Sequence, residues 1–296
     1  MSIWHRRAAW GAPLALLLLA RCASAPGTPA PVAAPPSAPG PRAASADPTA
    51  GAAYSDDAAL NAFFDGVFER RVARSPELQT RLGIRTDYGA WDDRSDARAR
   101  EDHELAKQDL ARLRSFPFEA LSPEAKVSYR VFEYVIERRL EQFPWRFHTY
   151  AFSPMRGVHA WSAAFLINYH RVGSVKDAEA YVARLRGLRG VLAQLEENIR
   201  VREERGILPP KFVFPLVIGS CRNLTSGRPF DPDAERSGAL LADFEKKLGE
   251  LEGLETVERA RLVAEATAAL REDVAPAYAS LIARLEALEA KATTDD

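Results

Sequence analysis

From residue 54 to the C-terminus, the hydrophobic residues of this chain recur at intervals of three and four. That spacing places them along one side of a helix, with polar residues on the other side. The segment after Ser55 is an example, and its apolar stripe consists of Leu60, Phe63, Phe64, Val67, Phe68 and Val72. The same periodicity continues through the rest of the body, so we predict an all-α fold, a multi-helix array or bundle.

Serine residues ahead of several apolar stripes mark where the helices begin. Ser55, Ser75, Ser95 and Ser122 each precede a proline or an acidic residue, an arrangement typical of a helix N-cap. In the helix after Ser122, Arg138, Arg139 and Glu141 are expected to point outward. The residues expected to face the core there are Val127, Val131, Tyr134, Val135 and Ile136.

The later part of the body contains one long helix and several shorter ones. Ser174 and Asp177 form a capping box in which Asp takes the place of the usual Glu or Gln. From there we expect a helix as far as Gly206. Gly187 and Gly190 are expected to weaken or bend its middle. Three amphipathic helices should follow, near residues 233–250, 255–273 and 274–291.

Two stretches are rich in apolar residues yet interrupted by proline and glycine. Phe143–Arg171 is predicted to be a helix end, a buried aromatic loop and a new helix from about Ala160. Residues 209–218 (PPKFVFPLVI) fit either a strand or a short buried helix closed by Gly219, and the helical surroundings favour the helix. We expect the two stretches to pack together as the wall of a cleft, burying Phe152, Trp161, Phe165, Phe212 and Phe214.

Residues 1–21 have the features of a signal peptide of the lipoprotein type. A basic segment precedes the apolar run at 13–20, which is too short to span a bilayer. The following Leu-Ala-Arg-Cys is similar to a lipobox, so Cys22 is the predicted lipidation site, although Arg21 stands where a small residue is usual. Cleavage after Ala25 to give a soluble secreted protein, and retention as an uncleaved anchor, are the alternatives.

Residues 22–53 are almost wholly Ala, Pro, Gly, Ser and Thr, a composition that favours a disordered tether. The tether would hold a helical domain at 54–296 away from a membrane surface. The predicted location is the cell envelope, with a lipid anchor as the membrane contact and the body in the periplasm or outside. Ala23 rather than Asp after Cys22 favours the outer membrane, by resemblance to the usual sorting rule.

The charge of the chain argues against nucleic acid as a partner. Removing residues 1–21 takes away three of the 40 basic residues and none of the 41 acidic ones, which leaves a net charge of −4 with His neutral. No basic stripe stands out along the helices.

Cys22 and Cys221 are the only cysteines. A lipid on Cys22 leaves Cys221 without a partner, and we predict it to be a small buried residue.

The motifs predict no catalytic residue and no metal ligand. Residues 103–107 (HELAK) approach the zinc-protease arrangement, but Lys107 stands where the second His is required, and a protonated amine cannot bind zinc. His148, His159 and His170 are eleven residues apart, but proline and glycine break the helix that would align them. No Gly-x-Ser-x-Gly motif is present for serine chemistry.

Several blocks taken in order resemble the bacterial family of exported, often lipidated proteins called domain of unknown function 885 (DUF885). The blocks are AFFD at 62–65, ARSPE at 73–77, LGIR at 82–85, YG at 88–89, WDD at 91–93, GVH at 157–159, FLIN at 165–168, PPKFVFP at 209–215 and RN at 222–223. Full-length members are about twice as long and resemble all-helical zinc metallopeptidases. Their presumed metal motif, His-Glu-x-x-Pro-Gly-His, does not occur here, so the resemblance implies the N-terminal half, without zinc ligands.

Two functions remain open at this stage. In the first, the chain is the substrate-cleft half of a zinc metallopeptidase-like protein, truncated and inactive alone, with a peptide or a missing C-terminal half as its partner. Its polar groups near the open side of the cleft would be His159, His170, Arg171 and Lys211. In the second, it is a stand-alone helical binding or scaffold lipoprotein. Neither function requires a cofactor on this chain.

Overall fold

The computed structural model describes residues 48–294 of the chain. The predicted signal peptide, the lipidation site Cys22 and the tether as far as residue 47 lie outside the described residues. Within the described part, no helix combines the length and the apolar character needed to cross a bilayer.

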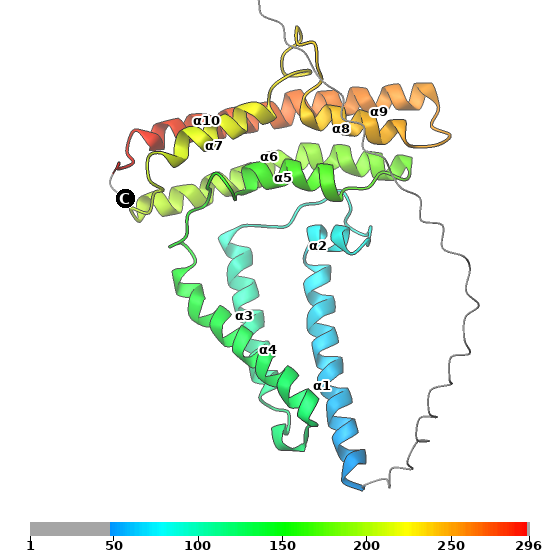
Figure 1. The fold of residues 1–296 in the computed structure, drawn as a ribbon, viewed down its shortest axis with the longest axis vertical. Coiled ribbons are helices and arrows are strands. Elements are labelled where there is room, and N and C mark those ends of the chain that lie inside the picture. Colours follow the sequence, from blue (N-terminus) through cyan, green and yellow to red (C-terminus); the bar gives the residue numbers. More distant parts are fainter. Residues whose placement is uncertain (1–47, 295–296) are drawn as a thin grey trace, which may run out of the picture. The chain divides into compact units, whose positions relative to one another are not determined.

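The described part of the chain is helical, as predicted (Figure 1). Its elements are α1 (Pro48–Ala73), α2 (Pro76–Arg81), α3 (Asp96–Leu113), η1 (Phe118–Ala120), α4 (Pro123–Gln142), η2 (Phe143–Trp145), α5 (Val158–Tyr169), α6 (Val175–Glu204), α7 (Val213–Leu224), α8 (Ala239–Gly249), α9 (Thr256–Ala269), η3 (Leu270–Val274) and α10 (Ala275–Glu289). Strand-like pairing within residues 48–294 is limited to two isolated bridges, Phe152 with Gly157 and Arg228 with Ser237. The all-α prediction is therefore confirmed.

Serine caps set the starts of four helices. The hydroxyls of Ser75, Ser95, Ser122 and Ser174 each accept the backbone N–H three residues further on, at 3.1–3.2 Å. The predicted cap at Ser55 is wrong, because α1 begins at Pro48 and Ser55 lies inside it. A proline is favourable in the first turn of a helix, where its missing N–H leaves no hydrogen bond unmade.

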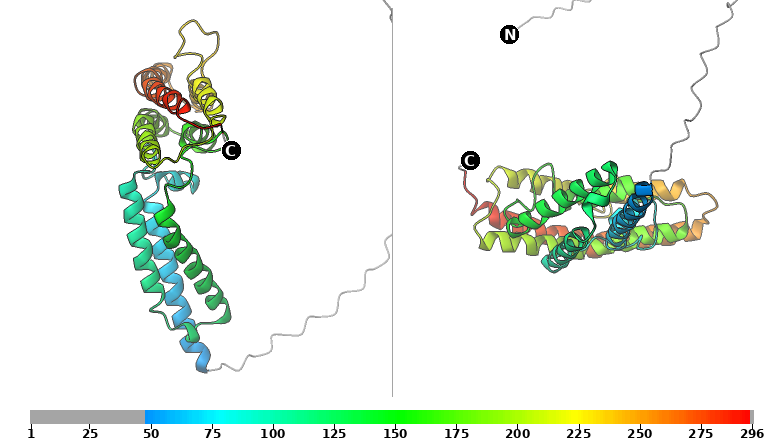
Figure 2. Two further views of the ribbon diagram at one scale, coloured as in Figure 1. Left: turned by 90° about the vertical axis from the view of Figure 1, so that its left-hand side faces the viewer. Right: turned by 90° about the horizontal axis from the view of Figure 1, so that it is seen from below.

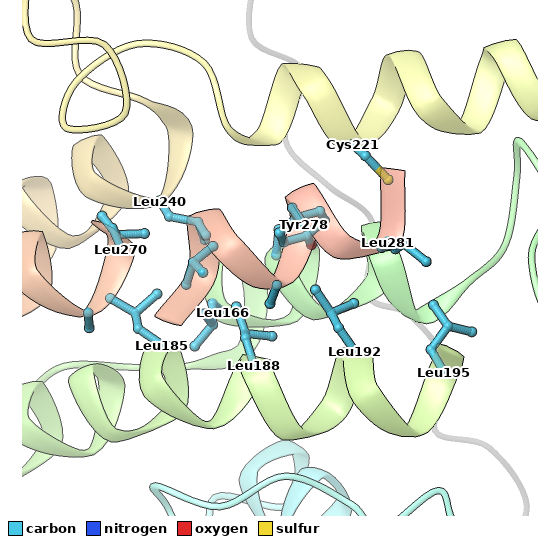
Figure 3. Packing of buried hydrophobic residues seen from close by; sticks show 14 of the residues in the cluster. Leu166, Leu185, Leu188, Leu192, Leu195, Cys221, Leu240, Leu270, Tyr278 and Leu281 are labelled. Carbon is cyan, nitrogen blue, oxygen red and sulfur yellow. The ribbon is translucent and has the colours of Figure 1, made fainter. Parts of the chain in front are cut away.

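The hydrophobic core consists of two clusters. The smaller one lies between α1, α3 and α4, which run alongside one another in Figure 2, and its buried members are Leu60, Ala106, Leu110, Leu113, Leu121, Tyr129 and Ile136. The larger one is built from α5 to α10, with α5 and α6 packed beneath α7 and α10 (Figure 2). In Figure 3 the leucines of α6, from Leu185 to Leu195, face Tyr278 and Leu281 of α10. Because each buried leucine contributes about 2 kcal/mol, this larger cluster supplies most of the apolar stabilisation.

The face of α4 that contacts the core differs from the predicted one at every position except Ile136. Tyr129 and Ile136 are buried at 5% and 6% exposure, with Phe132 and Leu140 packed beside them. Ile136 was expected to face inward and does so. The other four residues expected there are exposed, with Val127 at 64%, Val131 at 58%, Tyr134 at 63% and Val135 at 54%. Both sets have helical spacing, and the set that carries Phe132 is selected by its contact with the rings of Phe63 and Phe64 on α1.

The long helix α6 is continuous through Gly187 and Gly190, and it ends at Glu204, two residues before the predicted end at Gly206. At Gly187 the indole of Trp91 lies against the backbone, since a Cβ atom there would be 2.9 Å from Trp91 Cδ1. Gly187 therefore makes room for a neighbouring ring within an unbroken helix.

The C-terminal elements agree with the prediction in type and differ in their boundaries. The stretch 209–218 leads into helix α7, so the strand alternative is wrong, and α7 continues past Gly219 to Leu224. Helix α8 begins at Ala239 rather than near residue 233. The last two predicted helices are joined without a loop by η3, a five-residue π-helical turn.

Candidate functional site

The aromatic segment 143–171 contains a short turn that is anchored to the core at its base. Phe152 is 3% exposed and packs edge-on against Phe214 of α7, with 5.4 Å between ring centroids. The turn is closed by two hydrogen bonds, from Ser153 N–H to the Arg156 carbonyl at 2.7 Å and from Arg156 N–H to Ser153 Oγ at 2.9 Å. Met155 sits at the tip and is 94% exposed. The fold thus holds an apolar side chain out in solvent.

Helix α5 begins directly after this turn, close to the predicted start at Ala160. Its N-cap is Gly157, which provides no side chain to bond the first N–H groups. A Cβ atom at Gly157 would lie only 2.4 Å from Nδ1 of His159, so the close approach of this imidazole requires glycine. The start of α5 is therefore left without a side-chain cap.

A pocket of about 580 Å³ lies where the turn meets α5. Its lining residues are Arg94, Met155, Arg156, Gly157, Val158, Ala160, Trp161 and Ala164. The volume falls within the range of small-ligand sites, about 300–1,000 Å³. The wall is mostly apolar, with two guanidinium groups as its charged members.

Glu77 at the start of α2 fixes two of these lining residues. Its carboxylate accepts a hydrogen bond from Arg94 Nη2 at 2.6 Å and another from the indole N–H of Trp161 at 3.1 Å. Glu77 is 4% exposed, so water does not compete for these oxygens. The segment around Asp92 is fastened to α2 as well, because Asp92 accepts the Ser75 hydroxyl at 2.9 Å and the Glu77 N–H at 3.0 Å. The pocket wall is thereby preorganised.

Arg184 of α6 lies buried behind this wall, at 0% exposure. Its guanidinium donates to the Ala90 carbonyl at 3.0 Å and to Thr80 Oγ1 at 2.6 Å. Three aromatic rings surround it, those of Tyr88, Trp91 and Phe165, with centroids 5.0–5.5 Å from Cζ. Burial lowers the pKa of Arg184 to about 10, which leaves it protonated at neutral pH. It joins the loop 88–94, α2 and α6.

The two buried histidines are neutral at pH 7. Nδ1 of His170 accepts a hydrogen bond from Arg184 Nη1 at 3.0 Å. Nε2 therefore carries the imidazole proton and donates it in a hydrogen bond to the Asp177 carbonyl at 2.9 Å. Burial lowers the pKa of His170 to about 3 and that of His159 to about 4. Nδ1 of His159 is buried without a hydrogen-bond partner among residues 48–294.

The four residues predicted at the open side of a cleft occupy two environments. His159 and His170 are in the interior, at 1% and 0% exposure, and the rings of Tyr88 and Tyr181 pack against His170. Arg171 and Lys211 are exposed. The pocket at the turn is lined by other side chains, and a ligand contact of any of these four stays a prediction.

The five aromatic residues expected to be buried together divide in a similar way. Phe152, Phe165 and Phe214 are buried, as predicted. Trp161 is 37% exposed, because its indole N–H reaches Glu77 while its ring stays at the pocket wall. Phe212 is 61% exposed, because it precedes the first buried turn of α7 as the N-cap residue.

Sequence reasoning missed Glu77, Arg94 and Arg184. A signal existed for Arg184, which lies three residues after Tyr181 and four before Leu188 on the apolar stripe of α6. An arginine at such a position must be enclosed by acceptors and rings. Glu77 and Arg94 give no such signal. Glu77 is at the start of α2 and Arg94 is in the loop before α3, so neither belongs to an apolar stripe.

The described residues offer no metal centre. Within 48–294, no group of three or more His, Cys, Asp or Glu side chains lies close enough to hold an ion.

Cys221 is 0% exposed, and burial raises the pKa of its thiol to about 11, so it is the small buried residue that was predicted. His103 stacks on Phe143 at 3.9 Å between centroids, partly buried rather than fully solvated.

The fold and the pocket define an all-α domain with an open, partly apolar pocket beside a buried polar network. The chain belongs to the family described as bacterial protein of unknown function (DUF885), which matches residues 76–296. This confirms the resemblance drawn from the ordered sequence blocks. A comparison with curated proteins gave no match.

Among solved structures, the chain is similar to the crystal structure of a "putative lipoprotein" from Colwellia psychrerythraea. The TM-score is 0.67 at 15% sequence identity, and the similarity covers 81% of this chain and 42% of that chain. At this identity the similarity establishes a shared fold. The chain therefore spans about two fifths of the length of that protein.

Proposed function

We propose that this chain is a binding domain of the bacterial cell envelope that forms one wall of a peptide-binding cleft. The observation that carries the proposal is the pocket beside Trp161, whose wall Glu77 holds rigid before any ligand arrives. A preformed site of this kind avoids the entropy cost of ordering its side chains on binding. Two of the blocks quoted for the family, around Glu77 and Gly157, meet at this pocket.

In this proposal the chain binds peptide and does not cleave it alone. We assign any catalytic role to the motif His-Glu-x-x-Pro-Gly-His, which is expected in full-length relatives and does not occur in this sequence. No metal ligand is assigned to residues 48–294, where no suitable donor group comes together. Metal analysis of the purified chain should therefore find much less than one zinc per chain, and one tightly held zinc would contradict this part of the proposal.

The proposal places the domain on the outer membrane, through a lipid on Cys22. The support is the lipobox-like sequence around Cys22, together with the description of the solved neighbour as a "putative lipoprotein". Metabolic labelling with a fatty-acid analogue should mark the parent chain and be lost in Cys22→Ser. Equal labelling of both, or none in the parent, would remove the lipid anchor from the proposal.

Peptide binding can be tested with fluorescently labelled random tetrapeptides and anisotropy measurements on the purified chain. Trp161→Ala should lower the affinity about ten-fold or more, because it removes the largest apolar surface of the pocket. Trp145→Ala is the matched control, since Trp145 is 64% exposed and outside the pocket lining. No detectable binding, or an equal effect of both variants, would overturn the proposal.

The exposed face of α4 favours a second candidate, a scaffold that associates with another copy of itself. Val127, Val131, Tyr134 and Val135 form a continuous apolar stripe opposite the core face of this helix. Sedimentation experiments should then show dimers or larger species that Val131→Glu converts to monomers. Ala111→Glu, at an exposed position on α3, is the control and should leave them unchanged. A monomeric parent protein would exclude this candidate.

A further inference from the structure

The pocket at the aromatic turn combines apolar surface with one positive charge that is paired and one that is not. Met155, Val158 and Trp161 supply the apolar part. Arg94 is balanced by Glu77, with which it forms an ion pair at 2.6 Å. The guanidinium of Arg156 is exposed and forms no ion pair among the described residues. The pocket therefore carries one positive charge that no protein carboxylate offsets.

The start of α5 adds to this positive potential. The first N–H groups of a helix carry a partial positive charge, and here Gly157 offers no side chain to cap them. Among the described residues, no acidic residue lines the pocket. Two carboxylates that hold its wall are already engaged, Glu77 with Arg94 and Trp161, and Asp92 with Ser75 and the Glu77 N–H. An anion placed between Arg156 and the start of α5 would thus meet donors and no free carboxylate.

We propose that this pocket binds the carboxyl terminus of a peptide whose last side chain is apolar. The inference rests on the peptide-binding function proposed above and names the part of the peptide that is recognised. The terminal carboxylate lies against Arg156 and the first N–H groups of α5. The last side chain packs on Trp161 and under Met155, whose flexible thioether adapts to different apolar shapes.

The chemistry of the site selects a carboxylate attached to an apolar group. An amidated terminus lacks the charge that Arg156 and the helix start would stabilise. A polar last residue would leave the Trp161 ring without an apolar partner. The anchored turn, fixed by Phe152 in the core and by the Ser153–Arg156 hydrogen bonds, holds Arg156 and Met155 in place for both contacts.

The test compares two labelled peptides of sequence Ala-Ala-Ala-Leu, one with a free carboxylate and one with a terminal amide. The free acid should bind the full chain about ten-fold more tightly than the amide, since a charge-assisted hydrogen bond is lost. Arg156→Gln should remove that preference without weakening binding of the amide. Arg186→Gln is the control, because Arg186 is an exposed cation of α6 outside the pocket.

The outcomes separate this inference from the function on which it rests. If both peptides bind equally and Trp161→Ala weakens both, peptide binding stands and carboxylate recognition is overturned. If neither peptide binds, both are overturned. Decanoate carries the same carboxylate on an acyl chain and serves as a competitor. Displacement by decanoate as effective as by unlabelled peptide would overturn the assignment to a peptide terminus.

Discussion

Acidification should destabilise this fold through its two buried histidines. The pKa of His170 is lowered to about 3 and that of His159 to about 4, in both cases chiefly by burial. An unfolded histidine has a pKa of about 6.5, so below that pH the unfolded chain binds protons that the folded chain excludes. Stability is therefore complete above about pH 6.5 and is lost as the pH falls toward the folded values.

The size of the effect follows from the same numbers. At about pH 5 an unfolded histidine is almost fully protonated, whereas the folded ones remain almost neutral, which costs about 2 kcal/mol for each residue. The free energy of unfolding should thus fall by about 4 kcal/mol between about pH 8 and about pH 5. Urea unfolding followed by circular dichroism at these two pH values measures the difference.

His170→Gln isolates one of the two contributions. Its amide can donate to the Asp177 carbonyl and accept from Arg184, as the imidazole does, but it cannot titrate. The variant should lose about 2 kcal/mol of the pH dependence, whereas His148→Gln, at an exposed position, should keep it. A stability that is the same at both pH values, or a pH dependence unchanged in His170→Gln, would refute the assignment.

Three substitutions test the packing around the site, each by the shift of the urea midpoint. Arg184→Met should destabilise the fold by about 3–5 kcal/mol, because it leaves several buried acceptors without their donor, and a variant as stable as the parent would contradict that role. Phe214→Ala should cost about 3–5 kcal/mol through the cavity it leaves beside Phe152, so a change below about 1 kcal/mol would contradict the anchoring of the turn. Gly187→Ala should cost about 1–3 kcal/mol and alter the tryptophan emission, since its Cβ would displace the Trp91 ring, and an unchanged emission spectrum would argue against that contact.

The helix starts could be predicted because the capping interactions are local. Ser75, Ser95, Ser122 and Ser174 each bond a backbone group three residues away, so a short window of sequence contains the whole signal. The inward face of α4 could not be predicted in the same way. Two apolar stripes of equal spacing share this helix, and the choice depends on rings of α1 that are distant in sequence.

The candidate site was predictable as a region and not as a set of residues. Proline, glycine and aromatic residues between Phe143 and Arg171 marked the turn and the start of α5. The Glu77 contacts that organise the pocket join residues 17 and 84 positions apart, Arg94 and Trp161. Such contacts depend on how α2, the loop after it and α5 pack against one another. The periodicity within one segment carries no information about this packing.

The number of residues in the π-helical turn η3 determines which side of α10 faces the core. Leu262, Ala266, Leu270, Val274 and Tyr278 are all buried and follow one another at intervals of four. In a regular α-helix each such step rotates by about 40°, so the series would drift about 160° around the axis. A wider turn takes more residues per revolution and absorbs part of this drift. Deleting one residue between Leu270 and Val274 would turn the rest of α10 by about 100°, so we expect this chain to tolerate substitutions there far better than changes of length.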